Sequence, residues 1–186
     1  FLRKRRVISS HIEVMILNCL TMNPIPACAT SLLQFSMSET DSSYLKIENA
    51  RTDEQEKLMR KIDEDGVCPF CAEHFRKYHP RPIIEESDFW FFTENMSPYD
   101  HTKYHFIFVY KPSHITTPGK LVPGAAEDLF KLLSGAVQKY EIPGGSFFMR
   151  FGDGHYNGSS VNHLHAQLLM GNVGAPGYEK VRVKLG

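Results

Sequence analysis

The chain lacks an apolar run long enough to cross a membrane. Its best candidate, Val14–Leu20, contains Asn18 and follows Glu13, whereas a membrane helix needs roughly 18 or more consecutive apolar residues. The sequence therefore predicts a soluble protein with no membrane partner.

Net charge is also missing, because 21 lysines and arginines balance 21 aspartates and glutamates. Domains that bind nucleic acid usually carry a clear positive excess, so this balance argues against nucleic acid as a partner. A neutral protein has no long-range field that gathers anions. Any anionic ligand must therefore be held by local groups.

Cysteine is scarce, with four in the chain. Secreted domains stapled by disulfides usually carry more cysteines in a shorter chain. Cys68 and Cys71 are separated by two residues, a spacing found in metal sites and in redox motifs. A reducing, cytoplasmic compartment is therefore expected, with this pair as a metal clip; free thiols are the alternative.

The sequence divides into three parts of different character. Residues 1–40 open with basic residues and contain scattered prolines, which predicts a disordered leader or a non-native extension. Residues 41–65 are charged, and Thr52 followed by Gln55 has the form of a helix capping box, so a charged helical lead-in is expected. Residues 66–186 carry the sheet pattern and the residues suited to chemistry.

Apolar and alternating runs within residues 66–186 predict an α+β fold, an antiparallel sheet with a long helix packed on one face. The long helix is expected at 124–140, where apolar residues recur at helical spacing. The expected strands are 83–84 and 89–92 as a hairpin, 105–110, 146–151, 161–170, and an edge strand at 178–185.

The expected strand 161–170 carries the residues best suited to chemistry. Alternate side chains of a strand share a face, so His163, His165 and Gln167 are expected to point the same way. The preceding loop offers Gly158, Ser159 and Ser160, whose backbone N–H groups and hydroxyls suit a phosphate cradle. A neutral imidazole beside such a cradle suits attack on phosphorus. The alternative is a row of polar residues on a half-exposed strand.

These motifs together resemble the histidine triad (HIT) superfamily. The resemblance covers residues 66–171 and lies in the run His163–Gln167 behind Gly158–Val161, the cysteine pair, Thr93–Pro98 and Phe106–His114. Gln167 stands where most hydrolase members have a third histidine. This H-x-H-x-Q form is similar to the branch of galactose-1-phosphate uridylyltransferase and the dinucleoside polyphosphate phosphorylases.

The resemblance implies a HIT-like catalytic domain at 66–186 with a role for each matched position. His165 matches the nucleophile, and Gln167 matches the residue whose amide bonds the phosphoryl group, with His163 completing the catalytic set. Implied nucleotide-binding residues are Asn95 for the ribose, Gly158, Ser159 and Ser160 for phosphate, Trp90 or Phe89 for the base, and His105 near the phosphate. Gly152 departs from the family, which commonly has asparagine there.

The resemblance also implies a structural zinc held by Cys68, Cys71, His114 and His163. The implied function is a nucleotidyltransferase or nucleotide phosphorylase that acts on nucleoside polyphosphates or nucleotide sugars through a covalent nucleotidyl-histidine. A nucleotide hydrolase of the same family and a zinc-stabilised nucleotide-binding module without turnover are the alternatives. Pairing into a homodimer through the sheet edge is left open.

Overall fold

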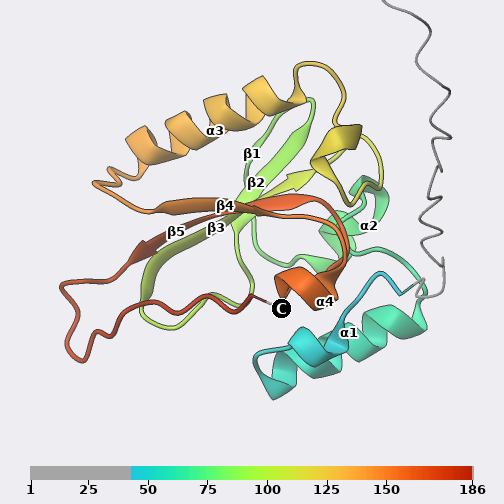
Figure 1. Ribbon diagram of the computed structural model, residues 1–186, viewed down its shortest axis with the longest axis horizontal. Helices are drawn as coiled ribbons and strands as arrows, with labels where there is room; N and C mark the ends of the chain where they lie inside the picture. The colour runs from blue at the N-terminus through green and yellow to red at the C-terminus, as the bar shows by residue number, and fades with distance from the viewer. Residues whose placement is uncertain (1–42, 186) are drawn as a thin grey trace, which may run out of the picture. The chain divides into compact units, whose positions relative to one another are not determined.

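The computed structural model describes residues 43–185 (Figure 1). The predicted leader at 1–40 lies outside the described residues. Within the described part of the chain, no helix combines the length and the apolar character that spanning a membrane requires.

Five strands form one antiparallel sheet in the order β1-β2-β3-β5-β4. The central strand β3 pairs with β2 on one side and with β5 on the other. The strands are β1 (Ile83–Glu86), β2 (Trp90–Glu94), β3 (Thr102–Tyr110), β4 (Ser146–Arg150) and β5 (His165–Gly171). The predicted α+β class is confirmed.

One face of the sheet packs against the long helix α3 (Ala125–Lys139), which runs along it in Figure 1. The helix turns Leu129, Leu132 and Ala136 toward the sheet, at the spacing that puts them on one face of a helix. They join aromatic residues of β2 and β3 in the main core. The long helix expected at 124–140 is therefore confirmed.

The opposite face carries short elements and the polar residues of β5. These elements are η1 (Ile47–Asn49), α1 (Asp53–Glu64), α2 (Ala72–Tyr78) and α4 (Gly154–Asn157), with η2 (Pro118–Lys120) between β3 and α3. Phe75 of α2 stacks on Phe91 of β2 with ring centroids 4.6 Å apart. Both faces of the sheet are thus covered. On the face opposite α3, the residues around β5 are polar.

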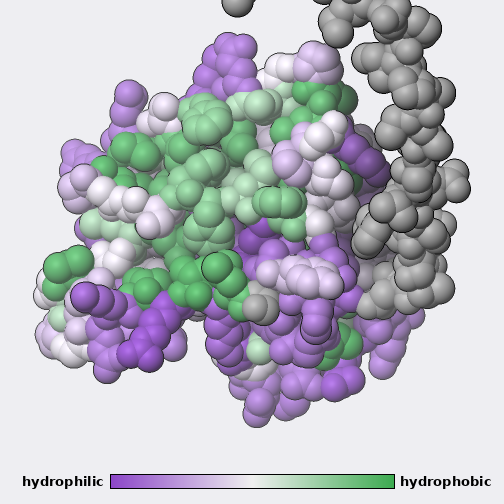
Figure 2. Space-filling view, in the orientation of Figure 1, coloured by the Kyte–Doolittle hydropathy of each residue, from purple (hydrophilic) through white to green (hydrophobic). Residues whose placement is uncertain are grey.

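Helix α1 forms where the capping box predicted it, because the Thr52 side chain accepts a hydrogen bond from the Gln55 backbone N–H. Its buried residues are Met59 and Ile62, which pack with Leu45. The rest of α1 is largely polar, and its region of the surface is mostly hydrophilic in Figure 2.

Strand β5 begins at His165, so the prediction that it begins at Val161 is wrong. Val161 forms an isolated bridge with Leu45, and the His163 N–H donates back to the Val161 carbonyl at 3.0 Å. The Leu164 N–H donates to the Ile115 carbonyl at 2.7 Å. These bonds leave residues 161–164 outside β5, so His163 does not belong to the strand that carries His165.

The expected edge strand at 178–185 is wrong, and the short helix α4 was not expected from the sequence. Residues 178–185 form no strand, because they make no ladder with a neighbouring strand among the described residues. The glycine-rich stretch before β5 is not all loop, since α4 forms there with Asp153 as its cap: the carboxylate accepts from the His155 N–H. Gly158 ends α4 at a φ of 67°, a left-handed conformation suited to glycine.

Candidate active site

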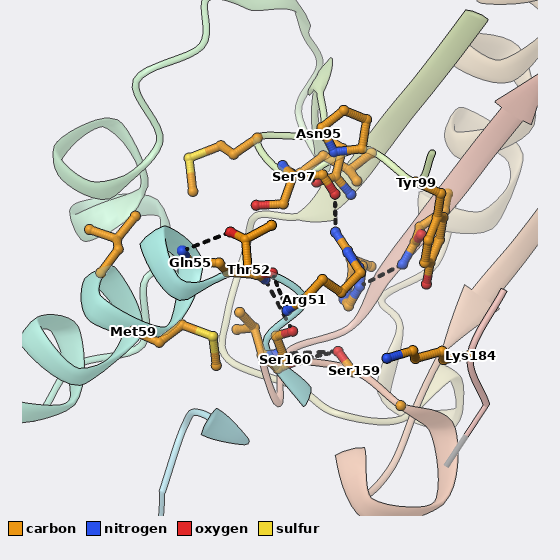
Figure 3. Close-up of a pocket in the computed structure, with 18 of the residues that line it drawn as sticks. Arg51, Thr52, Gln55, Met59, Asn95, Ser97, Tyr99, Ser159, Ser160 and Lys184 are labelled. Atoms are coloured by element: carbon orange, nitrogen blue, oxygen red, sulfur yellow. Dashed lines mark hydrogen bonds between the residues drawn. The ribbon is translucent and has the colours of Figure 1, made fainter. Parts of the chain in front are cut away.

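A cavity of about 890 Å³ opens over the polar face of β5. Its walls come from distant parts of the chain: the start and body of α1, the loop 95–101, the loop 158–161, His165 and Gln167, and the tail at 179–184. Figure 3 shows side chains from these segments turned toward one another. The cavity is therefore closed by the lead-in helix as well as by the sheet.

His165 is fixed with one ring nitrogen anchored. Nδ1 lies 2.7 Å from the His163 carbonyl oxygen. A carbonyl only accepts hydrogen bonds, so Nδ1 carries the hydrogen of the neutral ring and Nε2 carries the lone pair. His165 also lines the cavity. The side chain therefore has the tautomer that a nitrogen nucleophile needs.

Gln167 and His105 continue the hydrogen-bond chain from His165. The backbone N–H of Tyr99 donates to His105 Nδ1 at 3.1 Å, so the ring hydrogen of His105 lies on Nε2. That N–H donates to Gln167 Oε1 at 2.9 Å, which leaves the amide nitrogen of Gln167 facing His165 Nε2 at 3.3 Å. The register of β3 and β5 makes this possible, because Ile107, two residues after His105, lies opposite Gln167.

The imidazole rings of His105 and His165 are both neutral. Burial lowers the pKa of His105 to about 4 and the pKa of His165 to about 4. The charge of Arg150 lowers both further, while the carbonyl of His163 and the amide of Gln167 act in the opposite direction. The physical cause is the loss of water around the charged form.

The other polar residues predicted for nucleotide binding lie at the cavity wall. Asn95 Nδ2 lies 3.0 Å from His105 Nε2, and Asn95 Oδ1 accepts from the Ser97 N–H. The Ser160 hydroxyl donates to the Asn49 carbonyl at 3.2 Å. The Ser159 hydroxyl donates to the Val161 carbonyl at 2.8 Å, and Gly158, Ser159 and Ser160 all line the cavity.

Trp90 does not reach the cavity, so its predicted role at the nucleotide base is wrong. Its side chain is fully buried in the core under α3, and its indole N–H donates to the Ala125 carbonyl at 2.8 Å. Alternation along β2 is the reason, because Trp90 and Phe92 face α3 while Phe91 faces α2.

Cys68, Cys71, His114 and His163 come together beside the cavity. Their ligand atoms all lie within 4.8 Å of one another. Cys68 Sγ lies 3.4 Å from His163 Nδ1, and Cys71 Sγ lies 3.6 Å from His114 Nδ1. In a tetrahedral zinc site the sulfur and nitrogen ligands are about 3.6 Å apart, given the usual metal–ligand distances. The donor set and its spacing fit a metal ion, as the resemblance implies.

The outer partner of His163 supports the same conclusion. Its Nε2 lies 2.6 Å from the Tyr110 carbonyl, so Nε2 carries the hydrogen and Nδ1 faces the thiols with its lone pair. Burial, and secondarily Cys68, raises the pKa of Cys71 to about 12. Without a cation these thiols stay protonated, whereas a bound metal would take the place of their protons. The four residues could therefore hold a metal ion.

The cavity residues that the sequence did not single out include Arg51, Tyr99 and Arg150. Tyr99 stacks on His105 with ring centroids 5.0 Å apart. Arg150 lies directly opposite His165 in the register of β4 and β5. Nothing in the local pattern singles them out, because each reaches the site through contacts with distant residues.

No family model and no curated protein matches the chain. Several solved structures are similar to it. A protein titled "Hit Like Protein" is 20% identical, with a TM-score of 0.46 over 56% of this chain and 99% of that one. A HIT family hydrolase from Clostridium thermocellum is 21% identical, with a TM-score of 0.45 over 59% and 94%. A histidine triad protein from Clostridium difficile is 17% identical, with a TM-score of 0.45 over 60% and 96%.

These proteins bear the family name that the sequence resemblance predicts. The closer likeness to the uridylyltransferase and phosphorylase branch stays a prediction.

Proposed function

We propose that this protein is a nucleotidyltransferase or nucleotide phosphorylase in which His165 is transiently nucleotidylated. The observation that carries the proposal is the hydrogen-bond chain that leaves the lone pair of His165 Nε2 beside an amide donor in a large cavity. A buried neutral imidazole held this way is prepared to attack phosphorus.

The first step forms one bond and breaks one. His165 Nε2 donates its lone pair to the α-phosphorus of a nucleoside polyphosphate or nucleotide sugar. The bond from that phosphorus to the bridging oxygen breaks, and the leaving phosphate or sugar phosphate departs with the electron pair. The hydrogen on Nδ1 stays on the bond to the His163 carbonyl, so no proton has to move.

Gln167 is placed to stabilise the phosphoryl group. Its amide nitrogen carries two hydrogens, and one faces His165 Nε2 at 3.3 Å. The other is available to an oxygen of the α-phosphate, where a donor aimed at developing charge lowers the barrier. His105 holds the amide in this orientation by donating to Oε1.

The second step transfers the nucleotidyl group to an acceptor. An acceptor oxygen bonds to phosphorus, the nitrogen–phosphorus bond breaks, and the electron pair returns to Nε2. A phosphate dianion brings an unprotonated oxygen, whereas water must lose a proton that an amide at Gln167 cannot take. This difference favours phosphate or a sugar phosphate over water.

We propose zinc as the metal of the cysteine and histidine cluster. Two thiolates and two imidazoles in a tetrahedral arrangement are typical of structural zinc sites. A metal on His163 would hold the chain two residues before His165 and so fix the nucleophile. Cysteines kept as metal ligands suit a reducing compartment such as the cytoplasm.

Intact mass spectrometry tests the covalent step. The full chain is exposed briefly to a panel of nucleoside polyphosphates and nucleotide sugars, beside a His165→Ala variant. We expect a mass increase of one nucleoside monophosphate in the unchanged protein and none in the variant. The size of the increase also identifies the base.

The same experiment separates the rival functions. An adduct that disappears equally fast with and without inorganic phosphate would indicate a hydrolase. Nucleotide binding without adduct or turnover, checked by calorimetry and product analysis, would indicate a binding module and contradict the proposal.

A further inference from the structure

We infer that Arg51 and Arg150 form an anion site in the cavity that takes a phosphate group other than the one attacked by His165. The role of that phosphate in the reaction rests on the proposed function, but its binding does not. The two arginines come from the lead-in before α1 and from the end of β4.

Arg150 is the deeper member of the pair. It lies opposite His165, and directly opposed residues of antiparallel strands share a face with their Cβ atoms about 5 Å apart. The residue is only 4% exposed. Nη2 donates to the Tyr99 hydroxyl at 2.6 Å and to the Lys184 carbonyl at 2.9 Å. Nη1 is buried and has no hydrogen-bond partner among residues 43–185.

Arg51 also contacts Tyr99, so it lies in the same part of the cavity as Arg150. Its guanidinium lies 4.5 Å from the centre of the Tyr99 ring, and its Nη2 donates to the Ser97 carbonyl. Figure 3 shows Arg51 pointing into the cavity toward Ser97 and Tyr99. Its Nε is also buried without a hydrogen-bond partner in the described part of the chain. Each arginine therefore keeps an unused donor.

No carboxylate neutralises the pair. Neither arginine forms an ion pair with an acid among the described residues. Burial is the main cause that lowers the pKa of Arg51, and the charge of Arg150 lowers it further, while Tyr99 and Asp100 act in the opposite direction. Burying two like charges without a counter-ion is costly. An anionic ligand would remove this cost.

The chemistry of the two donors selects a phosphate. A guanidinium presents several N–H groups in a plane, which matches the oxygens of phosphate, and the resulting bonds are charge-assisted. A phosphate dianion balances both positive charges. Lys180, Arg182 and Lys184 also line the cavity, as do Glu54, Asp100 and Glu179, but none of these acids pairs with Arg51 or Arg150. The phosphate has two sources: inorganic phosphate or a phosphate monoester as acceptor, or the terminal phosphate of the leaving group.

Calorimetric titration with inorganic phosphate tests the binding directly. The variants are Arg51→Met and Arg150→Met, which remove the charge and keep much of the volume. The matched control is Arg60→Met, because Arg60 is on α1, is exposed and pairs with Glu56 outside the cavity. We expect the phosphate Kd to rise about tenfold to a hundredfold in the two variants, as expected for lost charge-assisted bonds, and to stay within about twofold in the control.

His165→Ala separates this inference from the proposed function. It should bind inorganic phosphate like the unchanged protein even though it forms no adduct. A phosphate Kd that Arg51→Met leaves unaltered would overturn the inference, whatever the adduct experiment gives. Arg51→Met decides the matter if Arg150→Met does not fold, because Arg150 also holds Tyr99 and the tail.

Adduct kinetics then distinguish the two sources. If Arg51→Met loses its adduct more slowly than the unchanged protein in the presence of phosphate, but forms it at the same rate, the anion site binds the acceptor. If Arg51→Met forms its adduct more slowly but loses it at the same rate, the anion site binds the leaving group. Either result supports the anion site, whereas unchanged formation and unchanged loss in Arg51→Met contradict a role for it in the reaction.

Discussion

His163 and His165 lie two residues apart, are both buried, and are anchored in opposite senses. In His163, Nε2 donates to the Tyr110 carbonyl, so Nδ1 is left to face Cys68. In His165, Nδ1 donates to the His163 carbonyl, so Nε2 is left to face Gln167. Burial lowers the pKa of each ring to about 4.

The difference between these neighbours lies in what meets the free nitrogen. At His163 it meets thiols, which suit a metal ion and hence stability. At His165 it meets an amide and a cavity, which suit a reaction at phosphorus. In both residues a backbone carbonyl fixes the ring, but the two rings are suited to different roles. Changes on the His163 side should act first on stability, and changes on the His165 side first on activity.

The largest effect is expected at the metal cluster, from His114→Ala. His114 is exposed, so truncation alone removes little packing. If the cluster holds zinc as proposed, loss of one ligand removes metal affinity that contributes to folding, and the melting temperature should fall by about 10 °C or more. Metal analysis should show less zinc, and a chelator should have little further effect on the variant.

The matched control for the metal cluster is His74→Ala. His74 is on α2 and is not part of the metal cluster found among the described residues. Its truncation should leave zinc content unchanged. Equal melting temperatures for His114→Ala and His74→Ala would contradict the expectation that the metal cluster stabilises the fold.

The second-largest effect is expected from Gln167→Met, a substitution that removes the amide at nearly constant side-chain volume. Adduct formation should slow by about 10²-fold to 10³-fold, the usual effect of losing one donor to developing charge. Zinc content should not change, and the melting temperature should fall less than in His114→Ala. Stopped-time mass spectrometry gives the rate.

Gln138→Met is the corresponding control because Gln138 is exposed on α3. A Gln167→Met protein that loses zinc as well as activity would show that the two regions are not separable.

Much of this arrangement could be predicted from local patterns. The period-two alternation that puts His165 and Gln167 on one face holds within β5. The long helix follows from its apolar spacing, and α1 follows from Thr52 and Gln55. These features depend on neighbours within a few residues, which is why the sequence indicates them.

Other features depend on pairings between distant segments. Arg150 lies beside His165 only through the register of β4 and β5, and Arg51 reaches Tyr99 only because the lead-in packs over the sheet. The late start of β5 depends on the bridge between Val161 and Leu45 and on the bond from Leu164 to Ile115. The seven residues of α2 are too few for a clear periodic signal. Trp90 was misplaced because alternation does not say which face meets the ligand.

A fourth buried histidine, His79, tests how far burial alone explains the lowered pKa values of His105, His163 and His165. Burial lowers the pKa of His79 from 6.5 to about 4, and its Nε2 lies 3.0 Å from the Thr93 hydroxyl. Because the folded state resists protonation, stability is full above the unfolded pKa and is lost as the pH falls toward the folded pKa. His79→Gln should therefore reduce the loss of unfolding free energy between about pH 7 and about pH 5 by roughly 2 kcal/mol.

Urea denaturation at both pH values measures this difference. Glutamine keeps an N–H donor for Thr93, so the comparison isolates the titration. An identical pH dependence in the variant and the unchanged protein would mean that His79 titrates normally and that burial does not set these pKa values.

The smallest effect, and the sharpest for mechanism, is expected from Gln167→His. An imidazole at this position can accept the His105 N–H as the amide does, but it can also take and return a proton. Water should then compete better as acceptor, so the ratio of hydrolysis to phosphate transfer should rise by about tenfold. Product analysis with and without inorganic phosphate gives the ratio. Because phosphate needs no proton removed, its own rate should change less than that of water, and a variant that slows both equally would show that the amide acts by position alone.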